Sequence, residues 1–276
     1  MLFGYNTNGF AHHRLEDALT ILAGLGYGSV AITLDHHALN PYDADLQPQL
    51  NRVRALLQEL RLRSVIETGA RFLLDPWHKH QPTLLSSDGP QREKRLDFLR
   101  RAVDVARGLG SDAVSFWSGA CQDEATRAVD MSRLVDGCRP LCDYAAQAKV
   151  RLAFEPEPGM FIDTMERFAE LHDRVAHPQL GLTIDIGHLH CQGETPIAAH
   201  LHRWRELVWN IHIEDMCRGV HEHLMFGEGE IDFDPVLGAL EEIRYANGVH
   251  VELSRHSHDA VEAARRALGY LRGIAR

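Results

Sequence analysis

Cysteine is scarce in this chain of 276 residues, and it cannot supply a disulfide framework. Only five cysteines occur, which is an odd number, and none forms the C-x-x-C pair typical of zinc-binding thiolates. Cys138 and Cys142 lie four residues apart in a helical pattern, so we predict that both are small core residues. This cysteine usage favours a reducing compartment, and we expect a cytoplasmic protein.

Long apolar runs and an excess of basic residues are also missing. No stretch approaches the roughly 18 uninterrupted apolar residues of a membrane span. The first residues show no basic segment followed by an apolar one, so no secretory signal is expected. Lys and Arg total 29 against 39 Asp and Glu, which gives a formal net charge of -10. This charge is unfavourable for sequence-independent contact with phosphate backbones. We therefore expect neither a membrane nor a nucleic acid as a partner.

What the chain does contain is one unit, repeated eight times: a β-branched run, a polar loop and an apolar-periodic helix. The runs predict strands near residues 2–5, 29–34, 64–67, 113–117, 151–154, 180–184, 208–213 and 249–253. Between and after them, helical spacing predicts helices near residues 15–25, 47–60, 96–109, 123–148, 165–175, 196–207, 235–245 and 260–271. Pro140 could interrupt the longest of these helices.

Alternation of strands and helices without a polar linker indicates a parallel sheet covered by helices. Eight such units in a chain of this length favour closure into a (β/α)8 TIM barrel, with residues 1–276 as a single domain. An open doubly wound sheet is the alternative. Such a sheet usually carries a glycine-rich phosphate loop after its first strand, and the segment Asn6–Phe10 is not of the form G-x-G-x-x-G. The barrel is therefore favoured.

Four consecutive predicted strands end in a carboxylate or an imidazole, namely Glu155, Asp185, His212 and Glu252. The active site of a barrel lies at the carboxyl ends of its strands. Buried carboxylates are costly unless they are paired or bind a metal. Three carboxylates and one imidazole form a mostly oxygen ligand set. We expect one divalent ion, with Mn²⁺ favoured and Mg²⁺, Co²⁺ or Zn²⁺ also compatible.

These strand ends resemble the xylose isomerase-like TIM-barrel superfamily, also called the sugar phosphate isomerase/epimerase family. It includes ketose 3-epimerases, inosose dehydratases and, more distantly, endonuclease IV. The most specific pieces are Asp185-x-x-His188, the run His212-Ile-Glu-Asp-Met-Cys-Arg-Gly, and Gly227-Glu-Gly-Glu-Ile-Asp-Phe. The resemblance follows the whole chain in order and is strongest from Leu152 to Glu252.

The resemblance implies that Glu155, Asp185, His212 and Glu252 bind the metal, and that the two glutamates also exchange protons with a substrate carbon through an enediolate. It implies that His188 and Arg218 hold substrate hydroxyls. The expected activity is a metal-dependent isomerase or epimerase acting on a keto-sugar or a polyol-derived ketone. The alternatives are a dehydratase or lyase on a keto-inositol or keto-sugar, an endonuclease IV-like phosphodiesterase, or a barrel that binds a metabolite without chemistry.

An insertion carrying His221 and His223 departs from the shorter ketose 3-epimerases. Endonuclease IV has an Asp and a His at these places, where they bind an additional zinc. The positions that would supply its other histidines read Thr68 and Trp117, which argues against DNA repair. We expect His221 and His223 to contact the substrate or the residues behind it, and a second metal stays open. Family members are often dimers or tetramers, so a homodimer or homotetramer is expected.

Several residues are expected around a small carbohydrate-like substrate. Glu157 is predicted to be either a substrate ligand or a solvated loop carboxylate, and Glu67 and Arg71 could line the pocket or lie elsewhere. His78 and His80 are interpreted as surface residues. The apolar side of the pocket is predicted to consist of Trp117, Phe72 and Phe226.

Overall fold

A closed barrel of eight parallel strands forms the centre of the computed structural model, which describes residues 1–121 and 123–275. The strands follow one another around the barrel in the order β1-β10-β7-β6-β5-β4-β3-β2. Each is bonded in parallel to its two neighbours. Their bounds are β1 Leu2–Asn6, β2 Ser29–Thr33, β3 Arg63–Glu67, β4 Val114–Phe116, β5 Leu152–Phe154, β6 Leu180–Asp185, β7 Val208–Ile213 and β10 Gly248–Val251. The predicted (β/α)8 barrel is confirmed.

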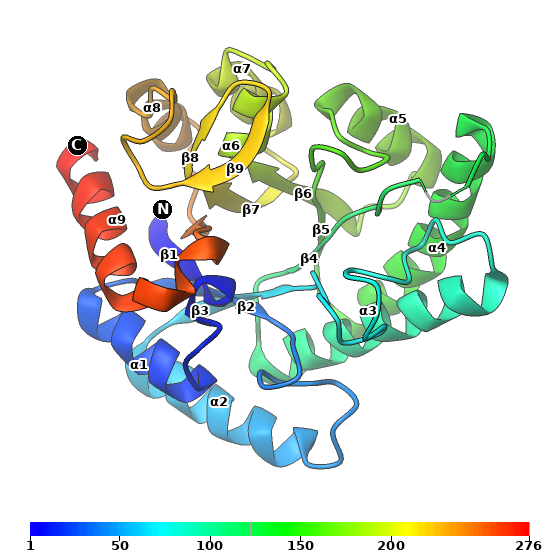
Figure 1. The fold of residues 1–276 in the computed structure, drawn as a ribbon, viewed down its shortest axis with the longest axis horizontal. Coiled ribbons are helices and arrows are strands. Elements are labelled where there is room, and N and C mark those ends of the chain that lie inside the picture. Colours follow the sequence, from blue (N-terminus) through cyan, green and yellow to red (C-terminus); the bar gives the residue numbers. More distant parts are fainter. Residues whose placement is uncertain (122, 276) are drawn as a thin grey trace.

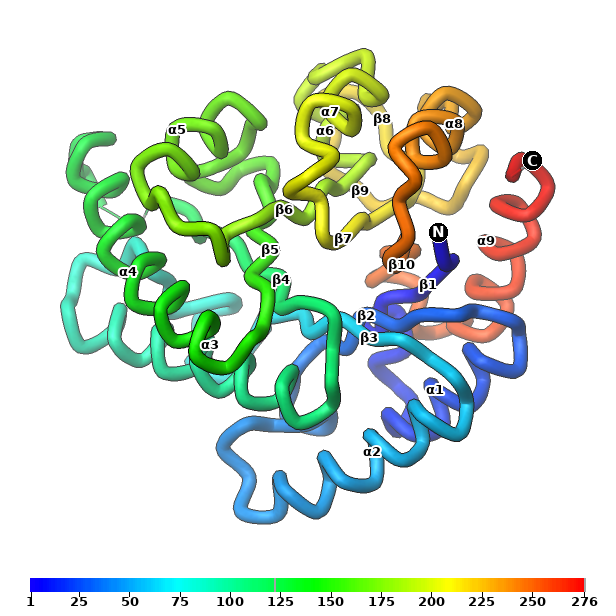
Figure 2. Tube along the Cα trace, turned by 180° about the vertical axis from the view of Figure 1, so that it is seen from behind, coloured from blue at the N-terminus to red at the C-terminus, as the bar shows by residue number. Residues whose placement is uncertain are grey.

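Helices surround this barrel on its outer side (Figures 1 and 2). They are α1 Leu15–Leu25, α2 Leu46–Leu60, α3 Gly89–Leu109, α4 Arg127–Ala148, α5 Met165–Val175, α6 Ile186–Cys191, α7 Ile197–Trp204, α8 Asp234–Glu242 and α9 Ala260–Ile274. Each long helix buries an apolar stripe against the strands, as α5 does with Met165, Phe168, Leu171 and Val175. Among the described residues, no helix is long and apolar enough to cross a membrane.

The two ends of the chain meet, which closes the ring of helices. Residues Leu2 to Tyr5 of β1 pair with Gly248 to Val251 of β10. The last helix lies beside the first one in both views (Figures 1 and 2). The hydroxyl of Tyr27, just after α1, donates a hydrogen bond to the carbonyl of Ala264 in α9.

The longest helix differs from its prediction in two ways. It begins at Arg127 rather than near residue 123, and it continues through Pro140. A proline ring removes one backbone hydrogen bond and crowds the preceding turn. Here Cys138 and Leu141, on either side of the proline, are fully buried against the core. This packing on both sides offsets the local loss, so the helix is not interrupted.

Several elements near the mouth of the barrel were not predicted. The short helix α6 follows β6 directly. After β7, the strands β8 Asp215–Cys217 and β9 Val220–Leu224 form an antiparallel hairpin. Gly219 forms the turn of this hairpin with a φ of +74°, a conformation that suits glycine. A 3₁₀ helix, η2 Ser254–Asp259, follows β10. These elements surround the carboxyl ends of the strands, so they lie where an active site would be.

A buried imidazole fills the barrel core on the amino side of those strand ends. His250 is fully buried, and its ring lies 2.8 Å from Ser29 Oγ and 2.8 Å from Asn210 Oδ1. Gly4 and Gly248 make room for it, because a Cβ atom on either would come within 2.3 Å of the ring. On the amino side of the strand ends, the interior of the barrel is therefore filled by a buried imidazole whose two nitrogens both have hydrogen-bond partners.

Candidate metal centre

Four side chains from neighbouring strands meet at the mouth of the barrel. Glu155 follows β5, Asp185 ends β6, His212 lies in β7 and Glu252 follows β10. One potential ligand atom from each lies within 4.8 Å of those of the others. His212 Nδ1 is 3.0 Å from Glu155 Oε1, 2.9 Å from Glu252 Oε2 and 3.9 Å from Asp185 Oδ2. The structure thus brings together all four residues that the sequence predicted as metal ligands.

Negative charge is in excess in this cluster. Burial raises the pKa of Glu155 to about 8, and repulsion from Glu252 adds to this effect. Although burial disfavours a charged imidazole, attraction by Glu67 and Glu155 holds the pKa of His212 well above its ordinary value. Burial would likewise raise the pKa of Glu252, but attraction by His212 holds that pKa below its ordinary value. Crowded carboxylates thus retain a proton on the imidazole.

The residues present fit a divalent cation. Asp185 Oδ2 is buried and has no hydrogen-bond partner among the described residues, although it lies inside the cluster. An unpaired buried carboxylate oxygen is costly. A cation replaces the proton that His212 would otherwise hold, because metal ligands must be deprotonated. The three carboxylates offer the oxygen ligands that hard divalent ions prefer.

Glu67, which the sequence left undecided, lies directly behind His212. His212 Nε2 donates a hydrogen bond to Glu67 Oε1 over 2.9 Å, and the Asn210 amide donates to the same oxygen over 3.2 Å. Nδ1 of His212 is therefore the nitrogen that faces the cluster. Such outer carboxylates fix the orientation of a metal-binding imidazole and raise its basicity.

Replacing Glu67 by Gln should weaken binding of a divalent ion roughly 10- to 100-fold, because the amide keeps the hydrogen bond but loses its charge. Calorimetric titration of the metal-free protein with Mn²⁺ measures the effect. Glu206→Gln is the matched control, since Glu206 is exposed and forms an ion pair with Arg205 at the protein surface. Equal affinities of Glu67→Gln and the wild type would contradict this role.

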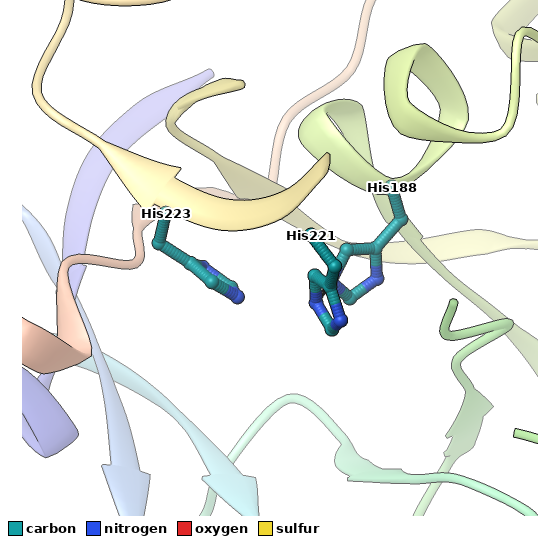
Figure 3. A group of neighbouring side chains, drawn as sticks. All are labelled: His188, His221 and His223. Atoms are coloured by element: carbon teal, nitrogen blue, oxygen red, sulfur yellow. Dashed lines mark hydrogen bonds between the residues drawn. The ribbon is translucent and has the colours of Figure 1, made fainter. Parts of the chain in front are cut away.

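A cavity of about 280 Å³ opens above the cluster. Five residues that the sequence proposed for substrate binding line it: Trp117, Glu157, His188, His221 and His223. Figure 3 shows the three imidazoles of this set, with His188 on α6 and the other two on the hairpin strand β9.

Other expected contacts lie outside the cavity. The guanidinium of Arg218 packs so close to Gly193 that a Cβ atom there would lie 2.8 Å from it, and Arg218 is not among the residues that line the cavity. Phe226 turns inward and stacks on Tyr270, with ring centroids 5.1 Å apart. Phe72 is 45% exposed. Of the three aromatic residues predicted for the apolar wall, the structure places only Trp117 there.

Some cavity residues escaped the sequence reasoning. The Asn8 amide, in the short 3₁₀ helix η1 Thr7–Phe10 that follows β1, donates to Glu252 Oε1 over 2.8 Å. His80, interpreted as a surface residue, lines the cavity and lies edge-on to Trp117 with ring centroids 5.4 Å apart. Lys79 also lines the cavity. Loop residues of this kind follow no periodic pattern, so only their closeness in sequence to a strand end could have indicated them.

Asp215 explains why a glycine-rich run follows the hairpin. Its carboxylate accepts hydrogen bonds from the backbone N–H groups of Met216, Gly227 and Ile231. A Cβ atom on Gly229 would lie 2.3 Å from Asp215 Oδ1. This part of the motif that carries the family resemblance therefore has a structural role, which is to fasten the loop after the hairpin.

Comparison with known proteins gives the same family. The family model described as xylose isomerase-like TIM barrel matches residues 19–274. The L-ribulose-5-phosphate 3-epimerase UlaE of Salmonella heidelberg (strain SL476) is 24% identical over 239 residues, which are 85% of this chain and 80% of that protein.

Two solved structures show the likeness in fold. The D-allulose 3-epimerase from Methylomonas sp. matches with a TM-score of 0.79 and 21% identity, covering 99% of this chain and 98% of that chain. It has also been crystallised in complex with D-allulose. The IOLI protein, which holds a zinc atom, matches with a TM-score of 0.77 and 20% identity, covering 99% and 98%. The resemblance seen in the strand ends is confirmed. The chain belongs to the xylose isomerase-like TIM-barrel family.

Proposed function

We propose that this protein is a divalent-metal-dependent sugar epimerase or isomerase, which moves a proton at a carbon next to a carbonyl. One observation carries the proposal: the carboxylates of Glu155 and Glu252 approach the same nitrogen of His212 from two different strands, 3.0 and 2.9 Å away, at the base of the cavity. Two carboxylates around one small space can serve as base and acid on a single substrate carbon. The names of the relatives, which are sugar 3-epimerases, support this reaction class.

Glu155, Asp185, His212 and Glu252 would hold the ion, and Mn²⁺ suits their mostly oxygen ligands best. When bound, a divalent ion stabilises negative charge that develops on substrate oxygens. The zinc atom in the IOLI relative supports a metal in this fold.

The protein's own side chains then perform the proton transfers. One glutamate removes the proton next to the carbonyl, and the substrate becomes an enediolate. The other glutamate returns a proton to the opposite face, which inverts that carbon. The Asn8 amide holds Glu252 through its Oε1 atom, 2.8 Å away, and so keeps this carboxylate directed into the cavity.

The cavity suits a small keto-sugar or polyol-derived ketone. Its volume of about 280 Å³ lies just below the range of roughly 300–1,000 Å³ for ligand pockets, as suits a small ligand. Glu157 offers a hydrogen-bond acceptor for hydroxyls, and Trp117 offers an apolar face for the carbon skeleton. We propose both as substrate contacts.

Solvent exchange tests the reaction class. The Mn²⁺-loaded protein is incubated in D₂O with ketopentoses and ketohexoses, both free and phosphorylated, and the products are followed by NMR and mass spectrometry. We expect an epimer or isomer that carries deuterium at the carbon next to the carbonyl. A product that has lost water would instead make the protein a dehydratase. The absence of exchange with every sugar would refute the proposal.

A further inference from the structure

We propose that His80 is a specificity-determining residue, whose Nε2 atom accepts a hydrogen bond from a hydroxyl at the end of the substrate remote from the reacting carbon. This inference rests on the proposed function and deepens it. His80 lies in the connection between β3 and α3 and lines the cavity. The strands β5, β6, β7 and β10, which bring the candidate metal ligands, are consecutive in the barrel, and β3 belongs to the other half. A keto-sugar with its carbonyl at the candidate metal centre would therefore extend its other end towards His80.

The backbone holds His80 in an unusual conformation. Its φ is +66°, in the left-handed region that residues other than glycine seldom adopt. The backbone N–H of His80 donates a hydrogen bond to the carbonyl of Arg71 over 2.6 Å. Such strained positions are concentrated at functional sites. His78, two residues earlier, is instead exposed and bonded to Asp75, so the two histidines of this loop differ in their surroundings.

The ring of His80 has one free acceptor. Its Nδ1 donates a hydrogen bond to the carbonyl of Gly69 over 2.6 Å. A carbonyl can only accept, so Nδ1 carries the hydrogen of a neutral ring and Nε2 keeps its lone pair. Burial lowers the pKa of His80 to about 4, although the bond to Gly69 opposes this, and the nearby charge of Lys79 adds to the lowering. Nε2 forms no hydrogen bond with the described part of the chain and is left accessible.

Trp117 and Arg95 fix this ring from the other side. The rings of His80 and Trp117 meet edge to face, with centroids 5.4 Å apart. The guanidinium of Arg95 lies 4.8 Å from the centroid of Trp117. Arg95 also donates a hydrogen bond to the carbonyl of Thr68 over 2.8 Å, next to the Gly69 carbonyl that His80 uses. One arginine thus supports both the aromatic neighbour and the backbone partner of His80.

Arg95 is unusual in itself. Its side chain is fully buried, and its Nη1 atom has no hydrogen-bond partner among the described residues. A buried charge is costly without a carboxylate partner. An apolar side chain would fill the same space without that cost. The charge is explained by what it does at the cavity wall: it stacks on Trp117 and disfavours a second proton on His80.

The free acceptor selects a hydroxyl over an anionic group. Ionised phosphate and carboxylate oxygens only accept, as Nε2 does, whereas a hydroxyl can donate. The guanidinium of Arg71 also lines the cavity, but Asp35, 3.5 Å away, and the carbonyl of Asn8, 3.1 Å away, already engage it. Lys79 is exposed, so water competes for its charge. We therefore expect a keto-sugar with a free terminal hydroxyl rather than its phosphate.

Paired substrates isolate this hydrogen bond. The Mn²⁺-loaded protein is assayed with ketopentoses and ketohexoses, each beside the analogue without the terminal hydroxyl and beside the terminal phosphate. The wild type should prefer the free sugar to the deoxy analogue by about 10-fold in kcat/KM, the effect of one hydrogen bond. His80→Asn should lose this preference, because asparagine tolerates the left-handed backbone but is too short to reach the hydroxyl. A merely structural defect would slow both substrates equally. His78→Asn is the matched control and should keep the preference.

Nitrogen NMR gives a readout that does not depend on turnover. In Mg²⁺-loaded protein with ¹⁵N-labelled histidine, the His80 signals, identified by their loss in His80→Asn, should show a protonated Nδ1 and a bare Nε2. Added free sugar should shift the Nε2 signal, and the deoxy analogue should not. If no sugar is converted but this shift occurs, the reaction fails and the recognition by His80 stands.

Three results would overturn the role of His80. They are a proton on Nε2 in the free protein, an Nε2 signal that no sugar shifts, and a preference for the terminal hydroxyl that persists in His80→Asn. Faster turnover of the phosphate than of the free sugar would equally contradict the expected selectivity. Circular dichroism checks that each variant is folded.

Discussion

Replacing either Glu155 or Glu252 by Gln is expected to lower kcat about 10³-fold, within the range known for the loss of a general acid or base. An amide has nearly the shape of the carboxylate but cannot accept a proton at neutral pH. The fold should persist, because Gln has nearly the same volume as Glu and can still form hydrogen bonds at the mouth of the barrel. Steady-state kinetics at saturating Mn²⁺ measures the loss, and thermal unfolding confirms that each variant is folded.

Isotope exchange distinguishes a lost proton carrier from a lost metal. With one glutamate intact, the protein should still exchange the proton of one epimer with solvent without converting it, and the two variants should exchange opposite epimers. Glu206→Gln, at an exposed position outside the cavity, should retain full activity. Full turnover in Glu155→Gln or Glu252→Gln would exclude the two-glutamate mechanism. Metal content measured on the same samples shows whether the ion was retained.

Removing the metal is expected to abolish turnover and lower the melting temperature. Without a cation, the buried carboxylates of the cluster are only partly compensated by His212. An ion present at 100 times its Kd stabilises the folded state by about 2.7 kcal/mol. This corresponds to a shift of roughly 5 to 11 °C, at about 2–4 °C per kcal/mol in a large domain. Scanning calorimetry before and after chelation measures the shift, and added Mn²⁺ should restore both properties.

Asp185→Asn is the matched variant for this experiment. Its side-chain oxygen can still accept the backbone N–H of His188, so α6 keeps its first turn. It loses the charge of the unpaired Oδ2 atom. Its melting temperature should therefore respond much less to chelation than that of the wild type. Undiminished turnover in wild-type protein shown to be metal-free would contradict a metal-dependent mechanism.

The barrel and the four residues of the candidate metal centre could be predicted from the sequence for one physical reason. Strands buried on both faces appear as short apolar runs, so a carboxylate or imidazole directly after such a run is conspicuous. Glu155 after Phe154 and Asp185 after Ile184 are examples. In a parallel barrel these ends must meet at one mouth, so the sequence order sufficed to bring them together.

The surroundings of the centre could not be predicted in the same way. The helix α6 has only six residues, too few to show a period, and β9 reads Val-His-Glu-His-Leu with mostly polar, partly exposed side chains. The directions of Arg218 and Phe226 depend on that hairpin, which is why neither reaches the cavity. Assembly as a homodimer or homotetramer stays a prediction from the family resemblance.

The hairpin β8–β9 has a consequence for how such a protein can change over generations. It forms its own two-stranded sheet and contributes no strand to the barrel. Substitutions in the exposed part of β9 should therefore change the stability of the barrel little. Yet the same strand brings two imidazoles into the cavity. A lineage could acquire, lose or exchange this element while inheriting the strand ends unchanged, and new substrate preferences would then arise without rebuilding the barrel.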